Sequence, residues 1–456
     1  MKKTLIIVVG FICFQMGFSQ DQPKSLSLQE AIDFALENSR TAINAARDIN
    51  AAEKQKWETT ASGLPQISAS VDYQNYLKQP VTLLPASILS QEERDNLGLG
   101  IDDQFPATFG TKHSMTAFAT LSQKIFDGSY LVGLQSAKVY LEISKNAKVK
   151  TDLEIRKAVI EAYGNVLLAE ESINIFERNI EVLEKNLFET QKIYENGLGE
   201  EESVEQLQIT LSGVKSNLNN VERLKTLAYQ MLNINLGLDI YDELTLTDNL
   251  ETLTDQNISL SILEVENNPE STIDYLIAQN DTKAKELLVK LEKSKALPTL
   301  NAFINGGYSG YGDEFAFTQK SQDWFGSSLF GVSLDIPIFS SGMRNASTQR
   351  AKINLEKAKT DLTETEQRIK LQIASAKSDY QFAIEDYQNK KENLALAERI
   401  ETKNQTKFFE GIGTSFELRQ AQTQLYSAQQ ELLQAMLDVI NSKATLETSL
   451  NTISLN

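Results

Sequence analysis

Few side chains in this chain could perform chemistry other than through a carboxylate. Cys13 is the only cysteine and His113 the only histidine among 456 residues. A zinc site or a histidine-based catalytic triad needs a second imidazole or thiol, and the sequence has none. We therefore expect no metal site, no cofactor and no enzymatic activity, and we interpret His113 as a polar residue just before a strand.

Acidic residues are common, so carboxylate chemistry stays open on composition alone. The acids in the most distinctive context follow two Gly-x-Gly motifs. Residues 200–202, all glutamate, follow Gly197-Leu198-Gly199, and Glu417 lies four residues after the end of Gly411-Ile412-Gly413. Acids at the start of a helix complement its dipole, but the three glutamates could instead contact a cation or a partner protein. The spacing of Thr414-Ser415-Phe416-Glu417 also fits a capping box.

The elements that would carry these motifs are unusually long helices. Residues 343–410 contain neither glycine nor proline and are rich in Ala, Glu, Lys, Gln and Leu. At about 1.5 Å per residue such a helix is roughly 100 Å long, so we expect a coiled coil or another extended helical assembly. Residues 129–196 form a matching stretch, interrupted only by Gly133 and Gly164.

An internal repeat relates the two long stretches. Each one ends at a Gly-x-Gly motif, and a Gln-x-Gln-x-x-Leu motif begins seven residues after the second glycine. The paired residues are 214 positions apart: Gln206, Gln208 and Leu211 match Gln420, Gln422 and Leu425. A fixed spacing of this kind marks a duplication. The sequence therefore predicts two long helical hairpins with tight glycine turns.

In residues 64–126 and 297–339 the period of the apolar residues changes from helical to alternating, as strands require. Four strands are predicted, with these residues on one face: Ile67, Ala69, Val71 and Tyr73; Met115, Ala117, Ala119 and Leu121; Leu300, Ala302 and Ile304; Phe330, Val332, Leu334 and Ile336. Such strands are typical of an outer-membrane barrel, although half-buried strands of a soluble sheet alternate as well. Aromatic residues near the loop-side ends would suit a membrane interface: Tyr73, Tyr76, Tyr308, Tyr311, Trp324 and Phe325.

Four strands are too few to close a barrel. An open sheet in lipid would leave unpaired backbone groups along both edges, which is costly. We therefore expect other copies of the chain to complete the sheet. Three copies would give twelve strands, an even number within the bacterial range, but these physical arguments alone do not choose three.

The N-terminus and the charge indicate the compartment. Lys2 and Lys3 precede an apolar run that ends near Gln20, the layout of a cleaved secretory signal. Its removal takes the net charge from −18 to −20 and also removes Cys13. Such an acidic chain repels phosphates, which argues against a nucleic-acid partner. No later segment approaches the roughly 18 to 20 apolar residues of a spanning helix, so strands would have to cross any membrane.

Three further motifs carry a family resemblance. They are residues 26–39, the pair Leu64-Pro65, and residues 331–342. With the duplication, they make the mature chain similar over essentially its whole length to the TolC-like outer-membrane efflux protein family. The resemblance implies a mainly α fold with a small β part. Duplicated long helical hairpins would form a trimeric α-barrel, and each protomer would add four antiparallel strands to a twelve-stranded transmembrane β-barrel.

The resemblance also implies an order of segments along the chain. These are a signal peptide at 1–20, periplasmic helices of the first repeat at 21–64, two barrel strands with a long external loop at 65–126, a long periplasmic helical hairpin at 127–236, an equatorial segment at 237–261, periplasmic helices of the second repeat at 262–297, two barrel strands at 298–339, a second long periplasmic hairpin at 340–450 and a tail at 451–456. Whether the loop at 77–112 is ordered stays open.

For function, the resemblance implies a passive, gated exit duct in the outer membrane that extends into the periplasm and serves a tripartite efflux pump or a type I secretion system. The implied partners are two further copies in a homotrimer, a periplasmic adaptor (membrane fusion) protein, an inner-membrane pump of the RND or ABC class, and outer-membrane lipid. The adaptor would dock on the two glycine turns, at Gly197, Leu198, Gly199, Gly411, Ile412 and Gly413.

The resemblance also implies a gate at the periplasmic mouth. Glu417 matches a position where the family often places an acid, and three such acids would attract cations and raise at least one pKa. Gln420 stands where a second acid is expected, and Gly413 and Ser203 stand where the closed-state lock has an arginine and an aspartate. The lock must therefore differ or be weaker, and Glu417 is either a gate acid or a helix cap.

Two other classes of protein would explain part of the sequence. A non-porous periplasmic or cell-surface structural coiled-coil protein accounts for the long helices and their turns, but not for four alternating strands. A secreted carbohydrate-active enzyme would need two acids about 5 to 9.5 Å apart in a cleft, and no spacing here indicates such a pair.

Overall fold

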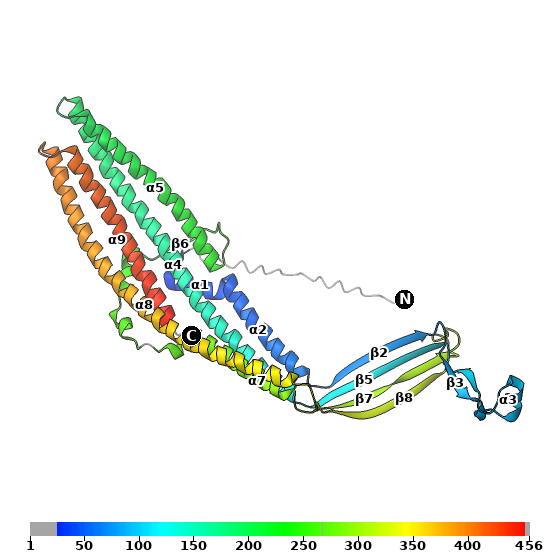
Figure 1. The fold of residues 1–456 in the computed structure, drawn as a ribbon. Coiled ribbons are helices and arrows are strands. Elements are labelled where there is room, and N and C mark those ends of the chain that lie inside the picture. The colour runs from blue at the N-terminus through cyan, green and yellow to red at the C-terminus, as the bar shows by residue number, and fades with distance from the viewer. Residues whose placement is uncertain (1–24, 267, 452–456) are drawn as a thin grey trace, which may run out of the picture. The chain divides into compact units, whose positions relative to one another are not determined.

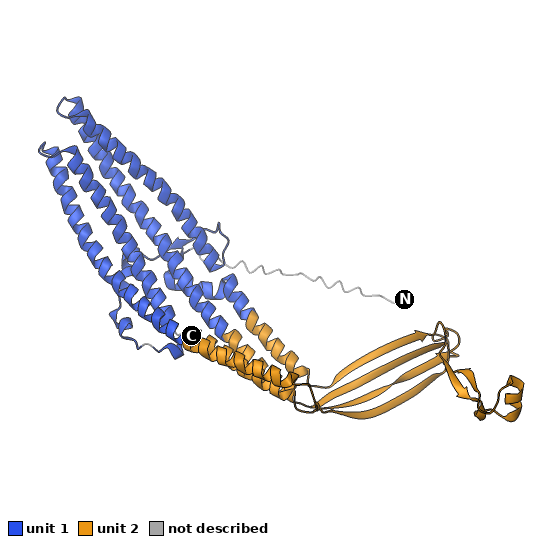
Figure 2. Cartoon of the chain, in the orientation of Figure 1, with its two compact units in different colours: residues 1–47, 146–276, 365–456 blue, residues 48–145, 277–364 orange. Residues whose placement is uncertain are grey.

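The computed structural model describes residues 25–266 and 268–451. The expected signal peptide at 1–20 lies outside the described residues, as does the tail beyond residue 451. The chain divides into two compact units (Figure 2): unit 1 comprises residues 1–47, 146–276 and 365–456, and unit 2 comprises residues 48–145 and 277–364. Among the helices of the described part, none is long and apolar enough to cross a membrane.

Two long helical hairpins make up most of the chain (Figure 1). The first consists of α4 (Gly128–Glu195) and α5 (Glu201–Leu236), and the second of α8 (Met343–Phe409) and α9 (Ser415–Leu450). The matching lengths, 68 and 67 residues for α4 and α8 and 36 each for α5 and α9, confirm the predicted duplication. Shorter helices precede the strands of each half: α1 (Leu28–Asn38), α2 (Arg40–Ala61) and α7 (Ile273–Ser294).

Short elements connect the two halves within unit 1. A two-residue strand near the start, β1 (Ser25–Leu26), pairs in parallel with β6 (Thr245–Leu246). After β6 come the helix α6 (Leu250–Asn257) and two 3-10 helices, Leu260–Glu264 and Pro269–Ser271. β6, α6 and the start of the first of these 3-10 helices lie within the segment expected at 237–261.

A buried tyrosine in each long helix holds this connection in place. Tyr163 of α4 donates hydrogen bonds to the Leu26 carbonyl at 3.0 Å and to Asp248 Oδ2 at 2.9 Å. Tyr380 of α8 donates to the Asn257 carbonyl at 2.6 Å and accepts from the backbone N–H of Ser259 at 2.8 Å. Both rings are fully buried, so each hydroxyl satisfies backbone groups that water does not reach.

In unit 2, four of the described strands form one antiparallel sheet in the order β2-β5-β7-β8. They are β2 (Gln66–Asn75), β5 (His113–Asp127), β7 (Thr299–Gly312) and β8 (Trp324–Asp335). The four strands are therefore present as predicted, and β5, β7 and β8 are longer than the alternating runs that indicated them. Within the described chain, β2 and β8 are the two edge strands of this sheet.

The register confirms that the predicted apolar sets share one face, except for Ile336, which lies one residue beyond the end of β8. Ile67 lies opposite Leu121, Leu121 opposite Ile304, and Ile304 opposite Phe330, so one apolar row crosses all four strands. Cross-strand neighbours on one face of a pleated sheet point the same way, because side chains alternate with a period of two. Ile67, Ile304 and Phe330 are exposed in the single chain.

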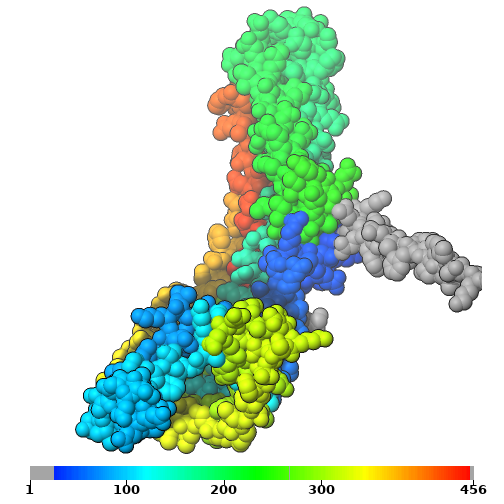
Figure 3. All heavy atoms as spheres, turned by 90° about the vertical axis from the view of Figure 1, so that its right-hand side faces the viewer, coloured from blue at the N-terminus to red at the C-terminus, as the bar shows by residue number. Residues whose placement is uncertain are grey.

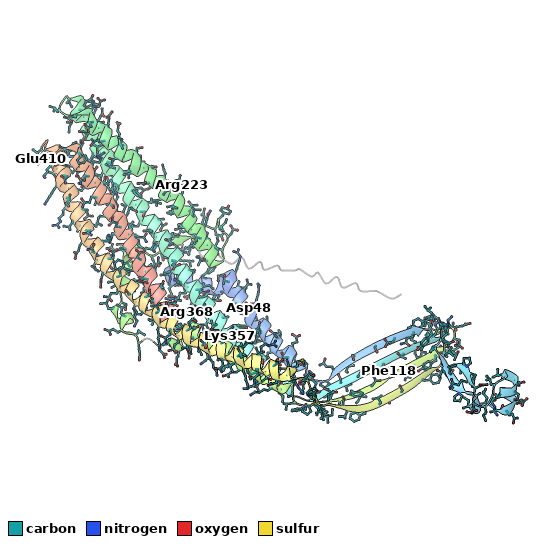
Figure 4. The ribbon with its side chains drawn as sticks, in the orientation of Figure 1. Asp48, Phe118, Arg223, Lys357, Arg368 and Glu410 are labelled. Atoms are coloured by element: carbon teal, nitrogen blue, oxygen red, sulfur yellow. The ribbon has the colours of Figure 1, made fainter. Side chains whose placement is uncertain are left out.

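The opposite face is mostly polar, although Tyr311, Phe325 and Leu329 also lie on it, and two of its aromatic rings lie across glycines. Phe118 packs against Gly307 of the neighbouring strand, and Phe303 packs against Gly331 (Phe118 is labelled in Figure 4). A Cβ atom at Gly307 would lie 2.7 Å from Phe118 Cδ1, and one at Gly331 would lie 2.5 Å from Phe303 Cζ. Only glycine leaves room for these rings, so the two aromatic residues can lie on the polar face.

The loop at 77–112, whose order the sequence left open, has secondary structure of its own. It contains β3 (Val81–Pro85), a 3-10 turn (Ala86–Ile88), α3 (Gln91–Leu97) and β4 (Gln104–Thr108), and β3 pairs with β4 in antiparallel fashion. His113, expected just before a strand, is the first residue of β5. Its Nδ1 lies 2.8 Å from the Tyr73 hydroxyl, and Phe315 and Phe317 pack edge-on against the ring of Tyr73.

Candidate functional site

The turns of the two hairpins, which we call the tips (residues 196–200 and 410–414), have the same backbone geometry. In the first tip the N–H of Leu198 donates to the Ile193 carbonyl at 3.0 Å, and in the second the N–H of Ile412 donates to the Lys407 carbonyl at 3.0 Å. The first glycine of each motif is left-handed, with φ of +72° at Gly197 and +74° at Gly411. This is a Schellman ending, in which glycine avoids the strain that a Cβ would cause.

The second glycine of each motif is required for a different reason. Neither Gly199 nor Gly413 has a positive φ. A Cβ at Gly199 would lie 3.0 Å from Ile193 Cγ2, and a Cβ at Gly413 would lie 2.9 Å from Lys407 Cβ. The chain returns so close to its own helix that a side chain would push it away. The Gly-x-Gly motif therefore combines one conformational and one steric requirement.

Between the two glycines, each tip presents one apolar side chain to solvent. Leu198 is 82% exposed and Ile412 is 73% exposed. In a Schellman ending an apolar residue at this position usually packs back on the helix, so the exposure of both marks them as available to a partner. Figure 1 shows both tips at the same end of unit 1, and Figure 4 labels Glu410, which begins the second tip.

The acids next to the tips differ between the two hairpins. Thr414 and Glu417 form a complete capping box, because Glu417 N–H donates to Thr414 Oγ1 at 3.2 Å and Thr414 N–H donates to Glu417 Oε2 at 2.9 Å. These hydrogen bonds hold the pKa of Glu417 below its ordinary value. The single chain therefore shows Glu417 as a helix cap. In the first hairpin Glu200 occupies the N-cap position, but its side chain caps no backbone N–H.

The other expected gate residues lie close to the same turns. Gln420 is exposed on α9, one helical turn after Glu417, and Ser203 is half-buried in the first turn of α5. Ser203 therefore follows one tip in the chain, and Glu417 and Gln420 follow the other.

Below the tips, a hydrogen bond that the sequence did not indicate connects the two hairpins. Gln405 Nε2 of α8 donates to Asn186 Oδ1 of α4 at 3.0 Å. Within the second hairpin, Gln422 of α9 is almost fully buried beside Glu401, and burial raises the pKa of Glu401. Such a layer packs less strongly than an apolar one. Only the absence of apolar residues at these positions could have indicated it.

The apolar face of the sheet is the second candidate surface. Aromatic residues lie at its loop end, where Tyr73, Tyr308 and Trp324 are exposed. At the end where strands join helices, Ile338 and Phe339 are exposed to 89% and 85%. The guanidinium of Arg344 fixes this turn by donating to the carbonyls of Pro337 and Ile338 at 2.7 and 3.2 Å. Apolar rows with aromatic residues near an end match the lipid face of an outer-membrane sheet.

The described residues contain no group of three or more His, Cys, Asp or Glu side chains that could hold a metal ion.

A family model described as outer membrane efflux protein matches residues 31–238 and 276–452. The outer membrane protein TolC of Vibrio cholerae is 22% identical over 456 residues, covering 100% of this chain and 96% of that protein. The probable efflux pump outer membrane protein TtgC of Pseudomonas putida is 23% identical over 433 residues, covering 93% of this chain and 82% of that protein. The solved structure of the outer membrane protein VceC from Vibrio cholerae has a TM-score of 0.69 at 16% identity, covering 93% of this chain and 95% of that chain, and shares the fold.

The lowered pKa of Glu417 gives a testable pH dependence. A carboxyl whose pKa is lowered by folding stabilises the folded state above its ordinary pKa, and this contribution is lost as the pH falls through the lowered value. We therefore expect Glu417→Gln to be less stable than the native protein at neutral pH, with the difference shrinking as the pH falls below the ordinary pKa of glutamate, about 4.3. Thermal unfolding of detergent-purified protein over this range measures it.

Glu201→Gln, which removes one charge from the first turn of α5, is the matched control and should show a smaller difference. A Glu417→Gln variant that is more stable than the native protein at neutral pH would contradict the cap. It would mean that several Glu417 carboxylates repel one another in the assembled protein.

Proposed function

The chain belongs to the outer membrane efflux protein family, and we propose that three copies of it form the passive, gated exit duct of a tripartite efflux pump or a type I secretion system. The chain is an outer-membrane channel protein. Channels of this family work with adaptor and inner-membrane pump components. The inner-membrane pump, of the RND or ABC class, would supply the energy, and this chain would supply the conduit.

The observation that carries the proposal is the apolar row that crosses all four strands. Ile67, Leu121, Ile304 and Phe330 lie side by side in the register, on a face that the single chain leaves open. A soluble protein would cover such a face, whereas lipid requires it. A non-porous structural coiled coil leaves this surface unexplained.

The strand order supports a closed ring of several copies. The four strands alternate in direction, so the β8 edge of one copy would run antiparallel to the β2 edge of the next. Pairing β8 with β2 around a ring satisfies the backbone groups of both edges, as lipid demands. With three copies the ring has twelve strands, and its inner face carries the polar residues with Phe118 and Phe303.

At the tips, the exposed side chains of Leu198 and Ile412 dock the adaptor, and the glycines on either side keep the backbone accessible. Apolar side chains that protrude from a rigid turn are suited to act as anchors in a partner's pocket, because little entropy is lost when they bind. Glu417, Gln420 and Ser203 line the periplasmic mouth behind the tips and form its gate.

Replacing both apolar tip residues tests the docking. We expect Leu198→Asp with Ile412→Asp to weaken binding of the adaptor by about tenfold or more, because two buried anchors are lost. A photoreactive residue at position 198 or 412 identifies the adaptor in cells by mass spectrometry, and co-purification compares the variants. The control places the photoreactive residue at Leu371, which is 72% exposed within α8, and should capture no adaptor. Equal capture at position 371, or an unchanged yield of adaptor with the double variant, would contradict docking at the tips.

Disulfide trapping tests the ring. The mature chain lacks cysteine once the signal is removed, so Ser70→Cys on β2 can be combined in turn with cysteine at Phe325, Ser327 or Leu329 on the same face of β8. We expect at least one pair to give covalent dimers and trimers on oxidation, with no larger species, in SDS gels without reductant. The single-cysteine variants are the controls. Monomers from every pair, or a ladder that continues beyond three, would contradict a ring of three copies.

A further inference from the structure

The segment 77–112, here called the arm, is a folded extension of the first hairpin of the sheet. The ladder between β2 and β5 ends at Asn75 and His113, and the N–H of Tyr76 still donates to the Lys112 carbonyl at 2.9 Å. The ladder resumes in the arm, where Val81 pairs with Thr108. β3 therefore continues β2, and β4 continues β5.

The outer part of the arm is also held in a defined conformation. Ser90 and Glu93 form a capping box on α3, and Gly98 ends that helix in a left-handed conformation. The N–H of Ala86 donates to the Asp103 carbonyl at 2.7 Å, which ties the two sides of the arm together beyond the ribbon. The arm can therefore present a fixed surface to a partner.

That surface is strongly apolar. Seven apolar side chains of the arm are between 55% and 94% exposed: Leu77, Val81, Leu83, Ile88, Leu97, Ile101 and Phe109. In Figure 3 the arm, in blue, lies apart from the loop end of the β7–β8 hairpin, in yellow-green. The hairpin of the same chain therefore does not cover the arm. An ordered segment with so many exposed apolar residues marks an interaction site.

The topology indicates which partner covers it. Since β2 is an edge strand of the sheet, β3 continues the side that has no partner within the chain. β3 also lacks the charged residues by which exposed edges usually avoid pairing. In the ring, the strand beside β2 is β8 of the next copy. The loop that leads into that β8, residues 313–323, then lies beside the arm.

We propose that the arm of each copy docks on the loop end of the neighbouring copy and locks the ring together on the side away from the helices. Val81 and Leu83 of β3 contact the neighbour's Phe315, which is 56% exposed in the single chain. This proposal rests on the proposed ring, and it adds an interface that the pairing of β2 with β8 does not require.

The test adds charge to one strand of the arm and not to the other. If the neighbouring copy covers β3, Val81→Lys with Leu83→Lys places two ammonium groups where water cannot reach them. We therefore expect the temperature at which the detergent-purified trimer dissociates to fall by on the order of 10 °C. Thr108→Lys is the matched control, because Thr108 lies opposite Val81 on β4, on the side away from the neighbour. It should leave this temperature unchanged. Native mass spectrometry after heating gives the fraction of trimer.

A disulfide between copies provides a second readout that does not depend on stability. We expect Leu83→Cys with Phe315→Cys to form covalent dimers and trimers on oxidation, and each single variant to stay monomeric in SDS. A native protein that forms no oligomer would overturn both the ring and the arm interface. Trimers that dissociate at the native temperature in the lysine variant, and that give no disulfide between copies, would overturn the arm interface and leave the ring standing. The same result would be expected if the arm contacted lipid or another protein.

Discussion

The unpaired backbone along the edges of the four-stranded sheet is the constraint on which the rest of the structure depends. In water, the N–H and C=O groups of β2 and β8 could bond to solvent. In lipid no such partner exists, and each unpaired group costs several kcal/mol. The apolar row from Ile67 to Phe330 directs the sheet to lipid, and the edges then require other copies. Assembly of several copies is in this sense a consequence of the alternation of apolar and polar residues along the strands.

The duplicated helices follow from the same requirement for closure. Each pair of strands is followed by one long hairpin, so the proposed ring of strands would be joined to a ring of helices. The two hairpins are alike in length and in the geometry of their turns. They differ in their caps, because Thr414 and Glu417 form a capping box and Glu200 does not. The second hairpin thus begins its return helix with a fixed carboxylate, whereas the three glutamates of the first lie in a turn that no side chain caps.

The sequence predicted those parts of the fold that depend on local pattern. The absence of glycine and proline from 343 to 410 specified α8 to within one residue, and the period of two placed the four apolar sets on one face, apart from Ile336, which lies just beyond β8. The repeated Gly-x-Gly motif identified both turns, because the backbone at these positions requires glycine.

Other features depend on contacts between distant residues and left no such pattern. β3 and β4 have five residues each, contain Pro85 and Pro106, and alternate too briefly to be recognised. Phe118 and Phe303 lie on the polar face only because Gly307 and Gly331 are opposite them. The hydrogen bond between Gln405 and Asn186 joins residues 219 positions apart. At the candidate site, the sequence allowed Glu417 to be either a helix cap or a gate residue, and the hydrogen bonds of the single chain show the cap.

The central claim is that copies of this chain enclose a water-filled path across the outer membrane. Single-channel recording of the detergent-purified oligomer in a planar bilayer tests it most directly. The account predicts discrete, stable conductance steps above the current of the bare membrane. A membrane-inserted oligomer that leaves the current flat at every applied voltage would contradict it.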